Sequence, residues 1–489
     1  MKQKYQILLL ISFLILPLMN AQAGVISGDE YAQRRAEIAE AVGANSLVIL
    51  FPNEDVTRND DVTWPFRQNT HLYYLTGNVT QKTHLLMLVG GDETEEYLFV
   101  EAANPQFETW IGRLPTEEEN IATSGVERIV PIARFEATIN GALNGRSRGE
   151  DRSRFAHFSR SVIKGEATVW LDLGGFRNID QDGSLSPEQA FAQKLRRQFP
   201  EIKIRNLAPL LSQMREVKSE NEITVLRHAI NATLAAHKAA MDAASGATTE
   251  AQIKAVIEAT FVNEGACCWG FPSIVAMGSN GTILHYTAND AALEHDKMIL
   301  VDIGAEKEYY TADVTRTFPL DGTFSKEQAD IYQIVLDAQS AAFELTHVGV
   351  EQKTLTDKAI EVVGAGLLEL GLITENTPEQ VRLYFFHGLG HSIGLDVHDP
   401  YNSFENPFQA GFVFTIEPGV YVRKKDVVAN PLFKGLSAEE QAGIIEKLDI
   451  YDGIAVRIED DVLVTDGAPV WLSDGAPRTI ADIEAYMAK

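Results

Sequence analysis

Residues 299–303 are Ile-Leu-Val-Asp-Ile, residues 414–418 are Phe-Thr-Ile-Glu-Pro, and residues 456–460 are Val-Arg-Ile-Glu-Asp. Each stretch is a short apolar run typical of a β-strand, and each is interrupted by an acid. A fourth acid, Asp313, lies in another apolar stretch. Because a buried carboxylate without a partner is costly, these acids need either solvent or a cation. Taken singly, each is most simply explained as pointing out of a half-solvated sheet.

A group of histidines makes a functional site the better interpretation. Residues 387–391 are His-Gly-Leu-Gly-His, and Gly394 and His398 follow. Glycines at this density argue against a regular helix and favour backbone that approaches another group closely. A lone histidine is usually structural, but three within twelve residues beside glycines indicate a site.

Two hydrolase motifs match this segment incompletely. His387 and His391 have the spacing of the H-E-x-x-H zinc motif, but position 388 is Gly, so the general base is missing. Residues 390–394, Gly-His-Ser-Ile-Gly, match the nucleophile elbow of serine hydrolases. That fold needs an acid and then a histidine well downstream. His398 is the only later histidine and leaves no room for them, so a serine hydrolase using Ser392 stays a remote alternative.

Together these stretches resemble the creatinase and Xaa-Pro aminopeptidase family of metallopeptidases. The resemblance covers nearly the whole chain after residue 23. Six ordered blocks carry it in the second half: residues 281–286, 301–304, 312–318, 387–399, 415–419 and 457–461. In the first half, Thr-Arg-Asn-Asp-Asp at 57–61 and Pro-Phe-Arg-Gln-Asn at 65–69 are similar to the N-terminal domain of aminopeptidase P.

The resemblance implies an α/β (α+β) fold in two domains. We expect a creatinase-type α/β domain at residues 24–208, followed at 209–489 by a pita-bread catalytic domain in which two αβ halves enclose a curved antiparallel sheet. Residues 141–165 are polar and rich in Arg and Ser, and predict a loop or insertion. Residues 424–451 form a connection longer than the family's usual one. We expect a helix there, at 437–448, and a position beside the mouth of the active site.

The resemblance also implies a dinuclear metal site. Asp302 would bind one metal, Asp313 and Glu459 would bridge both, and His391 and Glu417 would complete the second. Four carboxylates and one imidazole offset the charge of two divalent cations, and such an oxygen-rich set suits Mn²⁺, with Co²⁺, Zn²⁺ and Fe²⁺ as alternatives. Because all five ligands are present, a non-catalytic peptide-binding relative is a remote alternative.

The resemblance also implies roles in the mechanism for one of these ligands, Glu417, and for four further residues. A hydroxide bridging two metals about 3.5 Å apart would be the nucleophile. Glu417 would also shuttle the proton, while His285, His387 and His398 would position the substrate, with His285 and His398 in its binding site, and stabilise the tetrahedral oxyanion. Arg457 would hold the ligating acids in place.

The implied reaction is release of an N-terminal residue that precedes proline, with an Xaa-Pro dipeptidase (prolidase) as the alternative. An Xaa-Pro bond has no N–H, so peptidases that depend on that donor fail on it. Asp61 matches a family position that reaches a neighbouring subunit and holds the substrate's ammonium group. We therefore expect a homo-oligomer, a dimer or tetramer, although Asp61 is also compatible with a solvated loop.

Composition restricts partners and location. The net charge of −27 argues against binding nucleic acid, which needs clustered Lys and Arg. Lys2 and Lys4, the apolar run at 7–18 and Ala-Gln-Ala at 21–23 predict a signal peptide at residues 1–23. We expect a periplasmic or secreted protein without stable membrane insertion, the alternative being a retained anchor.

The chain has two cysteines, Cys267 and Cys268, which are adjacent. A disulfide between neighbours is strained, so we expect two free thiols. We also expect them to pack in the core.

Overall fold

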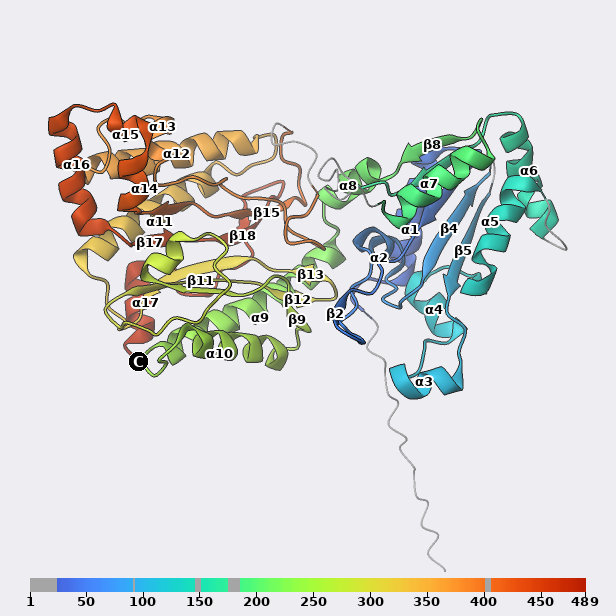
Figure 1. Ribbon diagram of the computed structural model, residues 1–489, viewed down its shortest axis with the longest axis horizontal. Helices are drawn as coiled ribbons and strands as arrows, with labels where there is room; N and C mark the ends of the chain where they lie inside the picture. Colours follow the sequence, from blue (N-terminus) through green and yellow to red (C-terminus); the bar gives the residue numbers. More distant parts are fainter. Residues whose placement is uncertain (1–23, 91–92, 146–150, 175–184, 401–405) are drawn as a thin grey trace, which may run out of the picture.

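The computed structural model describes residues 24–90, 93–145, 151–174, 185–400 and 406–489, without the side chains of 151–154. The predicted signal peptide, residues 1–23, lies outside these ranges. The chain forms two lobes joined near helix α8 (Ala208–Glu216), with the N-terminal elements in one lobe and α9 onwards in the other (Figure 1). Within the described residues, no helix has the length and apolarity needed to cross a bilayer.

The N-terminal lobe is built on a six-stranded mixed sheet with the order β6-β5-β4-β1-β7-β8. Its centre is β1, Ser-Leu-Val-Ile-Leu, whose five residues are all buried because helices cover both faces. It pairs with β4 in antiparallel and with β7 in parallel orientation. The strands of the lobe are β1 (Ser46–Leu50), β2 (Thr57–Asn59), β3 (Val62–Thr63), β4 (His84–Val89), β5 (Thr94–Val100), β6 (Ile129–Pro131), β7 (Thr168–Leu171) and β8 (Lys203–Asn206).

Helices cap and flank this sheet. They are α1 (Gly28–Val42), α2 (Thr70–Thr76), α3 (Pro105–Ile111), α4 (Glu117–Ser124), the 3₁₀ turn η1 (Ile132–Arg134), α5 (Phe135–Asn144), α6 (Asp151–Ile163) and α7 (Pro187–Gln198). The prediction of a loop over residues 141–165 is wrong for most of the segment. Phe155 and Phe158 lie one helical turn apart and are both buried, so α6 docks by one apolar face although its sequence is largely polar.

The second lobe contains small antiparallel sheets. One has the order β10-β11-β14, another β15-β18-β19, and β16 pairs with β17. An isolated bridge between Thr315 and Glu459 joins the first two of these sheets. The strands are β9 (Cys268–Trp269), β10 (Ile274–Met277), β11 (Met298–Ile303), β12 (Ala305–Lys307), β13 (Tyr310–Thr311), β14 (Val314–Pro319), β15 (Val413–Ile416), β16 (Gly419–Tyr421), β17 (Ala455–Arg457), β18 (Asp460–Leu463) and β19 (Val470–Trp471).

Helices enclose these strands from two sides, α9 and α10 on one and α11 and α12 on the other (Figure 1). Capping boxes at Ser219 and Ser325 fix the starts of α9 and α11. The helical elements are α9 (Glu220–Ala244), α10 (Glu250–Asn263), η2 (Gly278–Thr282), α11 (Lys326–Glu344), α12 (Gln352–Glu369), α13 (Pro378–Val381), α14 (Lys424–Ala429), α15 (Pro431–Lys434), α16 (Ala438–Tyr451) and α17 (Ile480–Met487).

The segment 424–451 folds as α14, α15 and α16. The predicted helix is present, and a capping box at Ser437 starts it. The expected position at the mouth of the active site is wrong. The segment packs against α11 at the outer edge of the lobe (Figure 1) and lines no part of the cavity described below. Its buried residues, among them Ile444, Leu448 and Tyr451, join the main core.

Buried ionic contacts connect helix α8 and the residues just after it to the second lobe. Arg215 of α8 lies 2.6 Å from Oδ1 of Asp399, and Lys218 lies 3.1 Å from Oδ2 of the same carboxylate. From the N-terminal lobe, Arg67 Nη2 donates to the Leu395 carbonyl at 2.6 Å. These contacts hold the loop that carries His398.

Candidate active site

The predicted site residues of the second lobe converge on one cavity of about 530 Å³. All nine line it: Asp302, Asp313, His391, Glu417, Glu459, His285, His387, His398 and Arg457. Apolar side chains complete the wall: Phe271, Pro272, Ile274, Leu284 and Val397. The cavity therefore combines a cluster of acids and imidazoles with an apolar surface.

The sheet register brings the acids together. Asp302 of β11 pairs with Thr315, the second residue of β14. Asp313 immediately precedes β14. Thr315 also bridges to Glu459, which immediately precedes β18. Strands far apart in sequence thus place three carboxylates where two of the small sheets meet.

The histidine loop is fixed alongside β15. The Thr415 amide donates to the His391 carbonyl at 2.9 Å, and the Glu417 amide donates to the Leu389 carbonyl at 2.8 Å. A Cβ on Gly390 would lie 1.8 Å from the Thr415 carbonyl oxygen, so only glycine allows this approach. The loop thereby sets His391 beside Glu417.

The donor atoms have the spacing of a metal site. The candidate ligand atoms of Asp313, His391 and Glu459 lie within 4.8 Å of one another. His391 Nε2 is 3.4 Å from Oδ2 of Asp313 and 3.7 Å from Oε1 of Glu417. Asp302 lies on the same cavity wall. Asp313, Glu417 and Glu459 therefore lie near His391, and Asp302 adds a fourth carboxylate to the same cavity.

These carboxylates lack enough positive charge from the protein. Asp313 and Glu459 are buried, and burial raises the pKa of each well above its usual value, with neighbouring carboxylates adding to the shift. Burial likewise raises the pKa of Glu417 to about 8, although Arg457 opposes the shift. Oδ1 of Asp302 is buried without a hydrogen-bond partner among the described residues. Such a set fits divalent cations, which would supply the missing charge.

His391 has the protonation state of a metal ligand. Its Nδ1 lies 3.1 Å from the Ser392 carbonyl, an acceptor, so this nitrogen carries the proton and Nε2 is left with a free lone pair. Burial, together with His398, lowers the pKa of His391 to about 3. The rings of His391 and His398 lie 4.0 Å apart.

Arg457 fastens the acids to their surroundings. It donates through Nη2 to Oδ2 of Asp302 at 2.5 Å and through Nη1 to the Tyr421 hydroxyl at 2.8 Å. Its Nε lies 3.3 Å from the Thr315 hydroxyl, which donates to Glu459 at 2.6 Å. One buried guanidinium thus reaches two of the acids, one of them through Thr315.

His387 is held rather than free. Its Nδ1 lies 2.7 Å from the Gly388 carbonyl, and its Nε2 lies 2.9 Å from the Tyr421 hydroxyl. Because Tyr421 accepts from Arg457, its own hydroxyl proton is directed to His387. Burial lowers the pKa of His387 to about 3. In this geometry both ring nitrogens are engaged, and Nδ1 is 3.8 Å from Glu417.

Tyr421 and Thr315 are site residues that the sequence reasoning missed. Tyr421 lies two residues after Gly419 on β16, and Gly419 is opposite Arg457 in the register. Glu417 lies between β15 and β16, so strand periodicity does not relate it to Tyr421 and gave no local signal. Thr315 gives no local signal either, because its partner Glu459 is 144 residues away.

Two other candidate residues lie apart from the cavity. Asp61 is exposed in the turn between β2 and β3, a hairpin whose residues are all exposed. Ser392 is buried, and its hydroxyl accepts from Lys218 and donates to the Val413 carbonyl. A serine hydroxyl held in this way is not presented to substrate, so the structure gives the serine hydrolase alternative no support.

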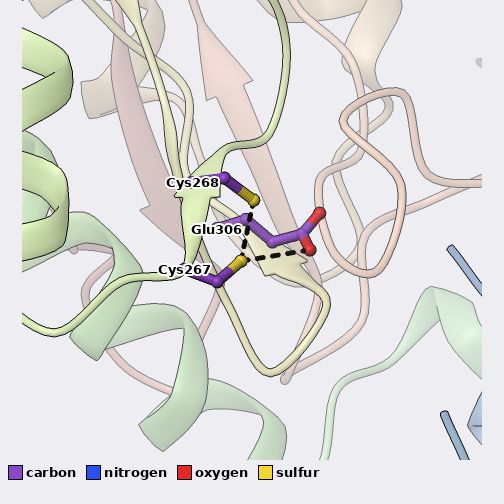
Figure 2. A group of neighbouring side chains, drawn as sticks. All are labelled: Cys267, Cys268 and Glu306. Atoms are coloured by element: carbon purple, nitrogen blue, oxygen red, sulfur yellow. Dashed lines mark hydrogen bonds between the residues drawn. The ribbon is translucent and has the colours of Figure 1, made fainter. Parts of the chain in front are cut away.

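The prediction that Cys267 and Cys268 pack in the core is wrong. Both are exposed free thiols on the short edge strand β9 and the residue before it, next to Glu306 of β12 (Figure 2). Both residues of β9, Cys268 and Trp269, are exposed, so this edge of the sheet is not covered by the core.

Comparisons with known proteins agree with this geometry. The profile of metallopeptidase family M24 matches residues 224–466, and that of the aminopeptidase P N-terminal domain matches residues 31–149. The Xaa-Pro aminopeptidase of Haemophilus influenzae is 32% identical over 467 residues, which is 94% of this chain and 97% of the relative.

Solved structures extend the likeness to three dimensions. The aminopeptidase PepP of Pseudomonas aeruginosa matches with a TM-score of 0.78 and 32% identity, covering 95% of this chain and 98% of the other. Aminopeptidase P from Escherichia coli with the inhibitor Pro-Leu matches with a TM-score of 0.78 and 27% identity, over 95% and 98% of the two chains. The chain belongs to the Xaa-Pro aminopeptidase family of M24 metallopeptidases, and is a hydrolase.

Proposed function

We propose that this chain is a dinuclear metal aminopeptidase that releases the N-terminal residue from peptides with proline in second position. The observation that carries the proposal is the convergence of the nine predicted site residues of the second lobe on one cavity with an apolar wall. The names of the relatives support the Xaa-Pro bond as the target.

Asp302, Asp313, His391, Glu417 and Glu459 would hold two divalent cations, with Mn²⁺ favoured by the oxygen-rich donors and Co²⁺, Zn²⁺ and Fe²⁺ as alternatives. Bound there, the ions would polarise the scissile carbonyl and lower the pKa of the attacking water. Arg457 would keep Asp302 and, through Thr315, Glu459 oriented for this task.

The remaining chemistry belongs to side chains of this protein. Glu417 takes the proton of the attacking water and returns it to the proline nitrogen as the bond breaks. Its position within 4 Å of both His387 and His391 supports this role. His285 and His398 line the cavity and position the substrate and the oxyanion, while His387, fixed by Tyr421, orients the loop.

The geometry favours an aminopeptidase over a prolidase. A dipeptidase must bind the free carboxylate of proline, usually with an arginine. Among the described residues, the one guanidinium that lines the cavity is that of Arg457, and its donors go to Asp302, Tyr421 and Thr315. None of the described residues lining the cavity therefore offers a free guanidinium to a proline carboxylate, which favours peptides that continue beyond proline.

Assembly and location complete the proposal. We infer a homo-oligomer in which Asp61 reaches the neighbouring active site and holds the substrate's ammonium group. Exposed apolar residues on and beside its hairpin, Val56, Val62 and Trp64, support a role in contacts between subunits. Export to the periplasm or medium, after cleavage behind Ala23, is supported by the sequence alone, and the mass of native protein starting at Gly24 would test it.

Metal dependence tests the catalytic proposal. Chelator should abolish activity and Mn²⁺ should restore it best, with up to two ions per chain. Asp302→Ala and Glu459→Ala should be inactive while the chain stays folded, and Ser392→Ala should stay active. Full activity in protein shown to be metal-free by elemental analysis would overturn the proposal.

A further inference from the structure

A second group of potential metal ligands consists of Cys267, Cys268 and Glu306. It contains two thiols, unlike the carboxylates and the imidazole of the catalytic cavity. The two sulfur atoms lie 2.8 Å apart, and Cys267 Sγ is 3.6 Å from Oε1 of Glu306 (Figure 2). One candidate ligand atom from each residue lies within 4.8 Å of the others. None of the three lines the catalytic cavity.

Glu306 is held so that one oxygen faces the thiols. Glu306 is buried, with 9% of the residue exposed, and its Oε2 lies 3.0 Å from Nη1 of Arg67. Arg67 is itself fixed by the Leu395 carbonyl and by the ring of Tyr309, which lies 4.5 Å away. The ion pair occupies Oε2 and leaves Oε1 directed at Cys267.

The backbone holds the thiols in place as well. The Cys267 amide donates to the Glu306 carbonyl at 3.0 Å, and Cys268 pairs with Glu306 in the β9–β12 register. The next residue but one, Gly270, donates to the Gly304 carbonyl at 2.8 Å. A Cβ there would lie 1.8 Å from the Thr311 hydroxyl, so the strand is pinned tightly just beyond the thiols.

A disulfide is the less favourable use of this pair. Consecutive Cα atoms are about 3.8 Å apart across a trans peptide. Cystines normally have Cα separations of about 4.4–6.8 Å. Chelation has no such requirement, since each sulfur needs only to reach a common ion.

We propose that Cys267, Cys268 and Glu306 form a binding site for a thiophilic divalent cation, Zn²⁺ or Cd²⁺. Two thiolates and a carboxylate supply three ligands, and water or another small ligand would complete a tetrahedron. Soft thiolates select such ions, whereas Mn²⁺ prefers the oxygen donors of the catalytic cavity. The protein would thus bind hard and soft cations at separate places, with release of the thiol protons at the soft site.

A cadmium titration of the reduced, Mn²⁺-loaded enzyme tests the proposal. Because the chain has only two cysteines, thiolate-to-cadmium charge transfer in the ultraviolet reports this group alone. The absorption should saturate at one Cd²⁺ per chain and should be absent in the double variant Cys267→Ser/Cys268→Ser. That variant should keep the Mn²⁺-dependent activity, because neither thiol touches the catalytic cavity.

Glu306→Gln should weaken cadmium binding at least about tenfold, since even losing a residue that merely hydrogen-bonds to a ligand costs about 10- to 100-fold. Glu264→Gln, a change to an exposed acid just before the same strand, should leave it unchanged. The proposal is overturned if no charge transfer appears, if Glu306→Gln binds like the wild type, or if native enzyme carries a disulfide between the two cysteines.

Discussion

The guanidinium of Arg457 lies 2.5 Å from Asp302, joining a strand of one small sheet to a carboxylate on another. The same side chain reaches Tyr421 and Thr315, so one cation orients partners that are up to 155 residues away in sequence. Its neighbours in turn hold His387 and Glu459. We therefore expect the proposed metal-binding geometry to depend on Arg457.

Arg457→Lys should lower Mn²⁺ affinity and kcat/KM by about 10- to 100-fold, because lysine keeps the charge but cannot contact Asp302 and Tyr421 together. Equilibrium dialysis and kinetics measure both effects. Arg423→Lys is the matched control, since Arg423 is exposed and pairs with Asp426. Wild-type Mn²⁺ affinity in Arg457→Lys would show that this arginine does not orient the ligands.

Glu417 should contribute less to the stability of the metal-free enzyme as pH rises. Burial raises the folded pKa of Glu417 to about 8, against about 4.3 in an unfolded chain. A group with a raised folded pKa stabilises the fold below its unfolded pKa, and that contribution disappears as pH rises through the folded value. The contribution of Glu417 to the melting temperature of chelated protein should therefore disappear between about pH 4.3 and pH 8.

Two comparisons isolate the Glu417 contribution. Chelated Glu417→Gln should show a shallower fall over the same pH range, because the amide does not titrate. Metal-loaded enzyme should also show a shallower fall, because cations compensate the carboxylates. Chelated wild type that becomes more stable towards pH 8 than Glu417→Gln would contradict this explanation.

Asp399→Asn should destabilise the fold by about 3–5 kcal/mol at neutral pH, because it leaves Arg215 and Lys218 buried without their shared carboxylate. Burial alone would raise the pKa of Asp399, but the two cations outweigh it and lower the pKa. The stability difference should therefore persist above the unfolded Asp pKa of about 3.9 and shrink as pH falls through the lower folded value.

Denaturant unfolding at several pH values measures that difference. Asp426→Asn is the control, since it removes an exposed ion pair with Arg423 and should cost no more than about 1 kcal/mol. If Asp399→Asn lowered the free energy of unfolding no more than Asp426→Asn, the contacts of Asp399 with Arg215 and Lys218 would not stabilise the fold.

Asp61→Ala should lower kcat/KM by roughly 10- to 150-fold, which corresponds to losing about 1.5–3 kcal/mol from a charged hydrogen bond to the substrate's ammonium group. Asp60→Asn is the control at the adjacent position, where asparagine tolerates the observed φ of 52°. Sedimentation should give a dimer or tetramer for both. An active monomer would rule out a contribution from the neighbouring subunit.

Short sequence blocks predicted the candidate ligands, because six of them in order resemble a known family, although each acid taken singly was most simply explained as pointing out of a half-solvated sheet. The glycines between His387 and His391 likewise indicated close backbone approach, which Gly390 makes against Thr415. Both are local patterns, and local patterns can be recognised in one sequence.

Other features depended on contacts that no local pattern encodes. Thr315 gains its role from register with a strand 144 residues away. Helix α6 forms in a polar segment because Phe155 and Phe158 dock on the sheet. Cys267 and Cys268 are exposed although β13, the other edge strand of the same three-stranded sheet, is buried, and no local pattern distinguishes the two edges.

Mass spectrometry of products from matched peptides tests the proposed activity most directly. Ala-Pro-Ala and longer Ala-Pro peptides should each lose only their N-terminal residue, and Ala-Ala-Ala should be a poor substrate. The bare dipeptide Ala-Pro should be cleaved at least about tenfold more slowly than Ala-Pro-Ala, a difference of about 1.4 kcal/mol in transition-state binding. The tripeptide should be preferred because Arg457, the one arginine among the described residues that line the cavity, already donates to Asp302 and Tyr421. A preference for Ala-Pro by more than about tenfold would instead make the enzyme a prolidase.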